Sequence, residues 1–466
     1  MQLKKALTQL NGLQFMIENL DLKSAMGKRF LVETPWFVPK KVIETELNLI
    51  EKTLENLETK SAFISKIQTR LSQLRDISGS IKNIGNKLIL DDIQLFEVKH
   101  FAMVVQEIIK LQKEHQLQLI EISGLEEVVK ILDPDKTNIP SFYIYDSYSE
   151  ELSIIRKELK IHKSKKFISE EEGNKELDLL FLQSEKLEST IREQLCNQLV
   201  KYHKNLEKAF ESVAHLDVII AKAIQAKQLG LSKPSIAKGL TIYKKMFNPQ
   251  IKEHLQLQQK EYQSIDIQLY KSLCFITGAN MAGKTVLLKT VALCQYLFQF
   301  GFYIPAENAE ICLVDKLLLL VDDLQSEENG LSSFASEMLK VNEMVAEVLK
   351  NDNVFVLIDE LARTTNPIEG KAIVNAVATI FNENNVRSLI TTHYSGLNAQ
   401  CRKLRVKGLL DSISTKNINA KNVNDFIDYS LVEDNVGDAP QEALRICELL
   451  GIHEEIVNKA QIELKK

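Results

Sequence analysis

The sequence lacks the features of a secreted or membrane-spanning chain. Its 466 residues include only 6 cysteines, spaced far apart, so neither a disulfide framework nor a zinc-binding cysteine cluster is predicted. No apolar run approaches the roughly 20 residues of a membrane span. The opening residues, Met1-Gln2-Leu3-Lys4-Lys5, do not lead into the apolar core of a signal peptide. We therefore expect a cytoplasmic protein.

Proline and glycine are absent between Asn174 and Leu229. Apolar residues recur there at helical spacing, and as one helix this stretch would span up to roughly 80 Å at about 1.5 Å per residue. After Pro39, a residue type that favours the first turn of a helix, apolar residues follow a near-heptad spacing from Ile43 to Leu74. The first half of the chain therefore predicts long helices, for which a plain bundle or coiled coil is the simplest explanation.

The second half contains a phosphate-binding loop pattern, between an apolar run at 273–277 that predicts a buried strand and a helical pattern from Thr285 to Phe300. Such a junction directs backbone amides and the positive end of a helix at one point. Lys284 would reach the β- and γ-phosphates of a nucleotide, and Thr285 would be a ligand of Mg²⁺. The alternative is an ordinary strand-to-helix turn. The pattern consists of Gly278, Ala279, Asn280, Met281, Ala282, Gly283, Lys284 and Thr285.

Two acidic residues follow a second apolar run. Residues 354–358 predict a strand buried on both faces, as in parallel sheets, and the run ends in Asp359-Glu360. Ligands of such sheets bind at the carboxyl ends of the strands. Asp359 would therefore hold Mg²⁺ through water, and Glu360 would polarise the water that attacks the γ-phosphate. Taken alone, the pair would also suit a solvated turn.

Two further segments add candidate residues. The run 388–391 predicts a third strand, and His393 just beyond it could hydrogen-bond the γ-phosphate, although a packed or solvated histidine is the simpler alternative for a lone residue. Residues 330–334, Gly-Leu-Ser-Ser-Phe, open a helical pattern that runs to Val348. Ser332 and its neighbour would either cap that helix or contribute to an anion site at its N-terminus.

In this order, these segments resemble the ATPase domain of the MutS family, a member of the ABC class of nucleotide-binding domains. The Asn280-Met281 pair is the mark of the MutS version of the loop. The resemblance is strong over roughly residues 240 to 462. Its motifs are the loop at 276–285, the signature region at 305–338, the extended Walker B stretch at 359–370, the switch at 391–394, and the closing strand and helix at 429–452.

The resemblance implies a dimer with two nucleotide sites. In the ABC class each ATP lies between the phosphate loop of one subunit and the signature serine of the other, so Ser332 would act in trans. The partner would be an identical or a related chain. In the first half, residues 22–31, 144–152 and 216–234 resemble the start of the family's helical core, the entry to its lever and the return to the ATPase domain.

We expect several parts with which that family acts on DNA to be absent or reduced. The expectation is that no mismatch-reading domain precedes the core, that a clamp is limited to about Lys165 to Leu187, and that no nuclease domain is appended near Lys466. Residues 364–367, Thr-Thr-Asn-Pro, replace a Gly-Thr-Ser-Thr run, and Ala282 replaces a glycine. The net charge of -5 and pI of about 6.0 show no overall basic footprint. The lysine cluster at 157–166 precedes three glutamates and is typical of a solvated helix end.

We predict an α/β ABC-class P-loop ATPase domain at residues 236–466, preceded by an all-α MutS-like core and lever domain at residues 1–235. ATP and Mg²⁺ are the expected cofactors. The family implies a DNA-binding, mismatch-repair-like ATPase. The altered and missing parts favour an ATP-driven protein-remodelling factor, such as the reactivase partner of an adenosylcobalamin-dependent amino-acid aminomutase. A nucleotide-gated scaffold with negligible turnover is the third possibility. The client, DNA or protein, stays open, and no membrane partner is expected.

Overall fold

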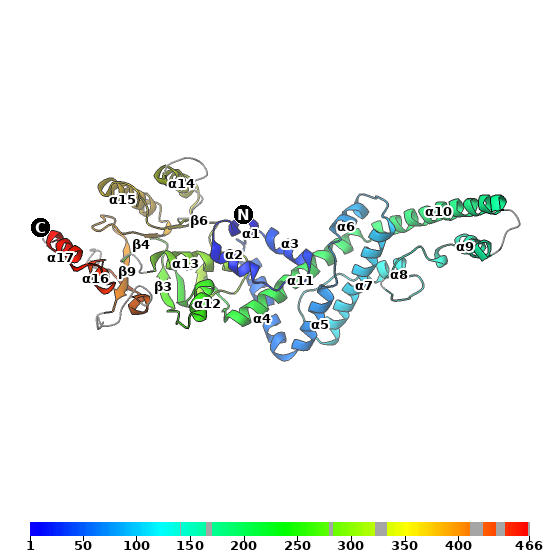
Figure 1. Ribbon diagram of the computed structural model, residues 1–466, viewed down its shortest axis with the longest axis horizontal. Helices are drawn as coiled ribbons and strands as arrows, with labels where there is room; N and C mark the ends of the chain where they lie inside the picture. Colours follow the sequence, from blue (N-terminus) through cyan, green and yellow to red (C-terminus); the bar gives the residue numbers. More distant parts are fainter. Residues whose placement is uncertain are drawn as a thin grey trace. The chain divides into compact units, whose positions relative to one another are not determined.

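The computed structural model describes residues 1–139, 141–164, 170–278, 283–321, 333–410, 423–434 and 443–464 (Figure 1). The chain divides into two compact units that interleave along the sequence. The first unit comprises Met1–Leu20, Pro35–Leu47 and Gln225–Lys466, and the second comprises Asp21–Thr34 and Asn48–Ile224. This division follows packing contacts, so the family-domain boundary predicted between residues 235 and 236 stays a prediction.

The second unit consists of helices and loops, with no strand among its described residues, as the absence of strand patterns predicts. One large apolar cluster forms its core and draws on helices far apart in sequence, including Ile67, Phe101 and Val213. The unit contains α3 (Ala25–Glu33), α5 (Ser61–Leu71), α6 (Ser78–Gly85), α7 (Asp92–Glu114), α8 (Glu126–Leu132), the short 3-10 helix η1 (Asp146–Tyr148), α9 (Glu150–Ser164), α10 (Glu170–Val200) and most of α4 (Lys40–Thr59) and α11 (His203–Leu229).

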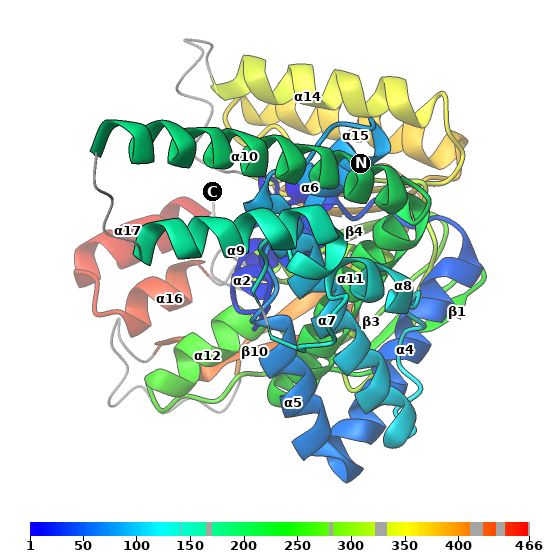
Figure 2. The same ribbon diagram turned by 90° about the vertical axis from the view of Figure 1, so that its right-hand side faces the viewer.

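The interpretation of residues 174–229 as one long helix is wrong, because α10 and α11 are separate helices. The amides of Lys201 and Tyr202 bond the carbonyls three residues earlier, at 3.3 and 2.9 Å, in a tight turn that ends α10. Leu195 of α10 packs in a small cluster with Leu152 of α9, whereas Leu199 near the end of α10 and Leu206 of α11 both belong to the main core. The change from the small cluster to the main core therefore falls within α10, and no proline or glycine marks the break that follows. Figures 1 and 2 show α9 and α10 running side by side.

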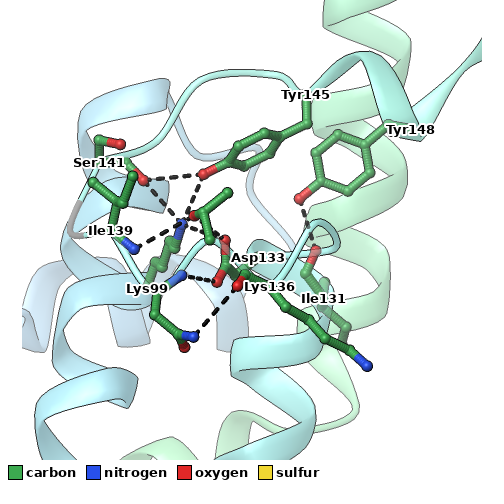
Figure 3. Close-up of polar contacts among 10 residues, drawn as sticks. Lys99, Ile131, Asp133, Lys136, Ile139, Ser141, Tyr145 and Tyr148 are labelled. Atoms are coloured by element: carbon green, nitrogen blue, oxygen red, sulfur yellow. Dashed lines mark hydrogen bonds and ion pairs between the residues drawn. The ribbon is translucent and has the colours of Figure 1, made fainter.

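A buried ion pair joins α7 to the segment between α8 and α9 (Figure 3). The Lys99 ammonium is fully buried, lies 3.0 Å from the Asp133 carboxylate, and donates to the Tyr145 hydroxyl at 2.7 Å. Burial raises the pKa of Asp133, but hydrogen bonds from the Asn138 amide and the Thr137 hydroxyl, together with the Lys99 charge, outweigh it and hold the pKa below its ordinary value. Every charge of the pair is therefore compensated inside the core.

The first unit contains a six-stranded sheet with the strand order β10-β9-β4-β8-β7-β6. Neighbouring strands are parallel except β10, which runs antiparallel to β9. The runs that predict strands are confirmed as β4 (Leu273–Thr277), β7 (Val354–Ile358) and β8 (Arg387–Thr391), each buried at every position. The other strands are β6 (Lys316–Leu320), β9 (Arg402–Leu409) and β10 (Ile427–Glu433).

Helices cover both faces of this sheet, which explains its continuous apolar strands. Alternate residues of β7, such as Val356, pack in one cluster with α14 (Ser333–Val348) and α15 (Pro367–Glu383). Both views show α14 and α15 side by side, and Figure 1 places α13 (Lys284–Gln299) on the opposite face. Other helices of this unit are α12 (Pro249–Leu257), α16 (Ala443–Leu449), α17 (Glu454–Leu464) and the 3-10 helix η3 (Val423–Phe426).

The α13 helix is buried along most of its length, because chain segments cover it on the side away from the sheet. Trp36 packs edge-on against Tyr296 and Phe300 of α13, with ring centroids 5.8 and 5.5 Å apart. The helices α1 (Leu3–Leu7) and α2 (Asn11–Glu18) belong to the same unit, and Tyr296 donates to Gln9 between them. A second sheet, of order β1-β5-β2-β3, consists of β1 (Ser235–Ala237), β2 (Thr241–Met246), β3 (Ile265–Leu269) and β5 (Asn308–Cys312).

No helix in the described ranges combines the length and the apolar content that crossing a bilayer requires.

Candidate functional site

Three neighbouring strands bring most of the predicted site residues to one edge of the sheet. β8 lies between β4 and β7, with Ile276 in register with Thr391 and Ile358 in register with Ile390. Because the three strands are parallel, the segments that follow them emerge at the same edge. The phosphate-loop helix, the Asp359-Glu360 pair and the histidine segment therefore meet there.

Asp359 is hydrogen-bonded to two threonine hydroxyls. Thr285, in the first turn of α13, donates to one carboxylate oxygen at 2.6 Å, and Thr391, at the end of β8, donates to the other at 2.5 Å. The Asp359 amide donates to the Leu320 carbonyl at 2.8 Å, which fixes the start of the turn. The result is a carboxylate and a threonine hydroxyl in contact, the hard oxygen ligands that Mg²⁺ prefers.

Lys284 and Glu360 form a second close pair. The Lys284 ammonium donates to the Gly278 carbonyl at 2.7 Å and lies 3.5 Å from a carboxylate oxygen of Glu360. Burial lowers the pKa of Lys284, and the carboxylates of Glu360 and Asp359 oppose that effect. The other oxygen of Glu360 lies 3.0 Å from Arg363. A strand–loop–helix junction thus presents a largely buried cation beside the candidate hydrolytic carboxylate.

The backbone around Glu360 is strained. Glu360 and Ala362 have φ angles of 47° and 59°, in the left-handed region that side chains disfavour. Each such residue costs on the order of 1–3 kcal/mol and persists only where neighbours enforce it. The Glu360 amide donates to the Thr391 hydroxyl at 2.9 Å, so the same threonine contacts both acidic residues.

His393 follows β8 and shares this electrostatic environment. Partial burial lowers the pKa of its ring; the Glu360 carboxylate raises it, and the charges of Lys284 and Arg363 lower it further. At neutral pH the ring is therefore neutral and able both to donate and to accept a hydrogen bond.

The two described glycines at the ends of the predicted phosphate loop have positive φ angles, which favour glycine. Gly278 and Gly283 have φ angles of 142° and 74°, and a Cβ at Gly283 would lie 3.0 Å from the Tyr429 ring of β10. Gly283 is also the N-cap of α13, so no side chain there competes for the amides at the helix N-terminus. Residues 279–282 of the loop and Ser332 lie outside the described residues.

Three contacting residues were not identified from the sequence. Thr391 and Tyr394 lie within the histidine motif, but their positions alone did not reveal that Thr391 bonds Asp359 or that the Tyr394 hydroxyl donates to the Ala362 carbonyl at 2.7 Å. Glu337 of α14 accepts from the Ala362 amide at 2.7 Å. Tyr394 and Glu337 lie 32 and 25 residues from Ala362 along the sequence, so no local pattern predicts either contact.

Comparisons with known proteins match the same part of the chain. Residues 274–466 match the family described as MutS domain V. The protein named Endonuclease MutS2 from Caldicellulosiruptor bescii is 30% identical over 339 residues, which cover 71% of this chain and 39% of the relative. Its namesake from Thermus thermophilus is 27% identical, covering 75% of this chain and 42% of the relative. The DNA mismatch repair protein MutS of Carboxydothermus hydrogenoformans is 27% identical, covering 77% and 45%. The chain thus spans less than half the length of these relatives.

Proposed function

Because the chain belongs to the MutS family, we propose that its α/β unit binds ATP together with Mg²⁺ and hydrolyses the γ-phosphate. One observation carries this proposal. Thr285 and Asp359 are in contact at 2.6 Å, and Lys284 lies 3.5 Å from Glu360, at the carboxyl ends of β4 and β7, which lie parallel on either side of β8. A cation that could bind phosphates, two oxygen ligands for Mg²⁺ and a carboxylate that could activate water therefore lie at one place.

The residues present fit Mg²⁺ and a nucleotide triphosphate. Asp359 and Thr285 offer the oxygen ligands, and Mg²⁺ bound there would neutralise charge on the phosphates. Lys284 would exchange its contact with Glu360 for the β- and γ-phosphates, which are the stronger anionic partner. The loop Gly278, Ala279, Asn280, Met281, Ala282 and Gly283 would supply backbone amides to the same phosphates.

Glu360 and His393 are proposed to act on the water and the γ-phosphate. Glu360 would orient the attacking water and accept its proton, a role that requires a carboxylate within hydrogen-bonding reach of that water. His393, neutral at physiological pH, would hydrogen-bond the γ-phosphate. Ser332 would contribute from the partner subunit of a homodimer or a heterodimer with a related chain.

Equilibrium titration with a fluorescent ATP analogue tests the nucleotide site. Lys284→Ala should weaken binding at least about a hundredfold, because a charge-assisted contact to phosphate is lost from a largely buried position. Lys289→Ala, on the same helix and further from the loop, is the matched control and should bind as the wild type does. Equal affinities for the wild type and both variants would refute the site assignment.

We further propose that DNA is the partner of the whole protein, bound weakly and without strong preference for a mismatch. The names of the relatives, an endonuclease and a mismatch repair protein, support a DNA role and do not favour the protein-remodelling alternative. Within the lysine cluster at 157–166, Lys157 and Lys160 are described and exposed on α9. A contact through phosphates would lose affinity steeply with salt, because bound counterions are released.

Fluorescence anisotropy on matched and mismatched duplexes, at low and near-physiological salt, tests this proposal. We expect weak, salt-sensitive binding that Lys157→Glu/Lys160→Glu reduces and that Lys204→Glu/Lys208→Glu, an exposed pair on α11, reduces less. Tight, mismatch-selective binding at physiological salt would instead point to a repair protein. Absent binding, combined with stimulation of ATP hydrolysis by a copurifying enzyme, would overturn the DNA proposal in favour of protein remodelling.

A further inference from the structure

The turn that carries Glu360 is held by hydrogen bonds to both backbone polar groups of one residue, Ala362. The Ala362 amide donates to the Glu337 carboxylate of α14 at 2.7 Å, and the Ala362 carbonyl accepts from the Tyr394 hydroxyl at 2.7 Å. The amide and the carbonyl of Ala362 are thus both fixed by side chains, one from α14 and one from the segment that follows β8. The site described above uses neither side chain.

This tethering acts on backbone that would otherwise relax. Ala362 and Glu360 both hold positive φ angles, of 59° and 47°, although neither is a glycine. The left-handed conformation is unfavourable for an alanine, so the hydrogen-bond partners of Ala362 determine whether the turn keeps its shape. Because Glu360 lies two residues away in the same turn, the direction of its side chain depends on that shape.

The α15 helix packs closely against the turn at a glycine. A Cβ added at Gly370 of α15 would lie 2.8 Å from the Cζ atom of Tyr394 and 3.0 Å from the Ala362 carbonyl oxygen. The absence of a side chain at Gly370 therefore lets α15 lie beside both the Tyr394 ring and the Ala362 carbonyl. The Tyr394 amide donates to the Thr392 hydroxyl at 3.0 Å, which fixes the backbone of Tyr394.

We propose that Glu337 is a positioning residue for ATP hydrolysis: its carboxylate, opposed by the Tyr394 hydroxyl, holds the left-handed turn that directs Glu360 at the attacking water. The proposal rests on the ATPase function proposed above. It places the effect of Glu337 on the hydrolytic step and not on nucleotide affinity, since Glu337 accepts a hydrogen bond from the amide of Ala362, in the turn that carries Glu360. Tyr394 has the same role through a neutral and weaker hydrogen bond.

Two measurements on the full chain test this role. Hydrogen exchange of the nucleotide-free protein reports the Ala362 amide, and ATP hydrolysis together with analogue titration reports kcat and affinity. Glu337→Ala should speed exchange at residues 360–363 and lower kcat about tenfold or more, with affinity unchanged within about twofold, because a hydrogen bond to a charged acceptor is lost from the turn alone. Tyr394→Phe, which removes only the hydroxyl, should show a smaller change of the same kind.

Glu337→Gln and Glu343→Ala are the controls. The glutamine keeps an acceptor oxygen and should recover most of the hydrolysis rate. Glu343 is an exposed glutamate on the same helix, and its loss should change neither readout. A wild-type rate in Glu337→Ala, or a loss of affinity equal to the loss of kcat, would overturn the inference alone. A wild-type protein that binds or hydrolyses no ATP would overturn the proposed function, and the positioning role with it.

Discussion

His393 shows how single side chains set the charge balance of the candidate site. Burial is the main cause of its lowered pKa, Glu360 raises the value, and Lys284 and Arg363 lower it. The signs of these effects differ, so each neighbour can be tested separately. A histidine with a lowered folded pKa also contributes stability that is complete above its ordinary value of 6.5 and is lost as pH falls towards the folded value.

We predict that an NMR titration of the His393 ring gives a pKa below 6.5. Lys284→Ala and Arg363→Ala should each raise it, because a nearby positive charge is removed, and Glu360→Gln should lower it further, because a negative charge is removed. Lys289→Ala serves as the control, with no expected change. Shifts of the opposite sign would show that His393 does not share the environment of these three groups.

Among the elements, those that carry the site were predictable from the sequence, and the limits of the long helices were less so. β4, β7 and β8 are continuous apolar runs because helices cover both faces of the sheet, and the sequence shows this directly. The break between α10 and α11 leaves no local signal, since neither proline nor glycine marks it and Leu199 and Leu206, on its two sides, pack in the same core. The polar contacts of Glu337 and Tyr394 with Ala362 depend on the tertiary arrangement in the same way.

The site residues also divide into those that local sequence patterns predict and those whose contacts depend on the tertiary arrangement. The phosphate loop, Asp359-Glu360 and His393 were predicted from residue types after apolar strands, because parallel strands bring such residues to one edge. Thr391 was missed as a partner of Asp359, since its role depends on the register between β8 and β7. Residues 279–282 and Ser332 lie outside the described residues, and their roles stay predictions.

The Lys99–Asp133 pair is predicted to fasten α7 to the segment that leads into α9. Lys99→Met should destabilise the protein by about 3–5 kcal/mol, because it leaves Asp133 as an uncompensated buried charge. Since the folded pKa of Asp133 is lowered, the stabilisation from this carboxylate is complete above its ordinary pKa of 3.8 and is lost as pH falls through the folded value.

Denaturant unfolding followed by helical circular dichroism measures this cost, with Lys113→Met, an exposed lysine of the same helix, as the control. Removing Asp133 as well should cost less than the sum of the two single variants, because the pair acts together. A change below about 1 kcal/mol in Lys99→Met would contradict a paired buried charge.

At the scale of the whole molecule, the proposed dimer predicts that two defective subunits can complement each other. Lys284→Ala removes a subunit's own phosphate contact, whereas Ser332→Arg is expected to damage the site of its partner. A mixture of the two variants should therefore recover about one working site per mixed dimer, while each variant alone stays inactive. ATP hydrolysis measured across mixing ratios tests this, and recovery at no ratio would indicate that Ser332 acts within its own chain or only caps α14.

The central claim is that the sheet edge formed by β4, β8 and β7 hydrolyses ATP with Glu360 as the carboxylate that activates water. Single-turnover hydrolysis of radiolabelled ATP by Glu360→Gln, with affinity measured on the same preparation, tests it most directly. Glu369→Gln, an exposed glutamate of α15, is the matched control. The account predicts wild-type affinity and a hydrolysis rate reduced roughly a hundredfold or more in Glu360→Gln, since positioned acid–base groups contribute about 10²–10⁴-fold. A Glu360→Gln variant that hydrolyses ATP at the wild-type rate would contradict it.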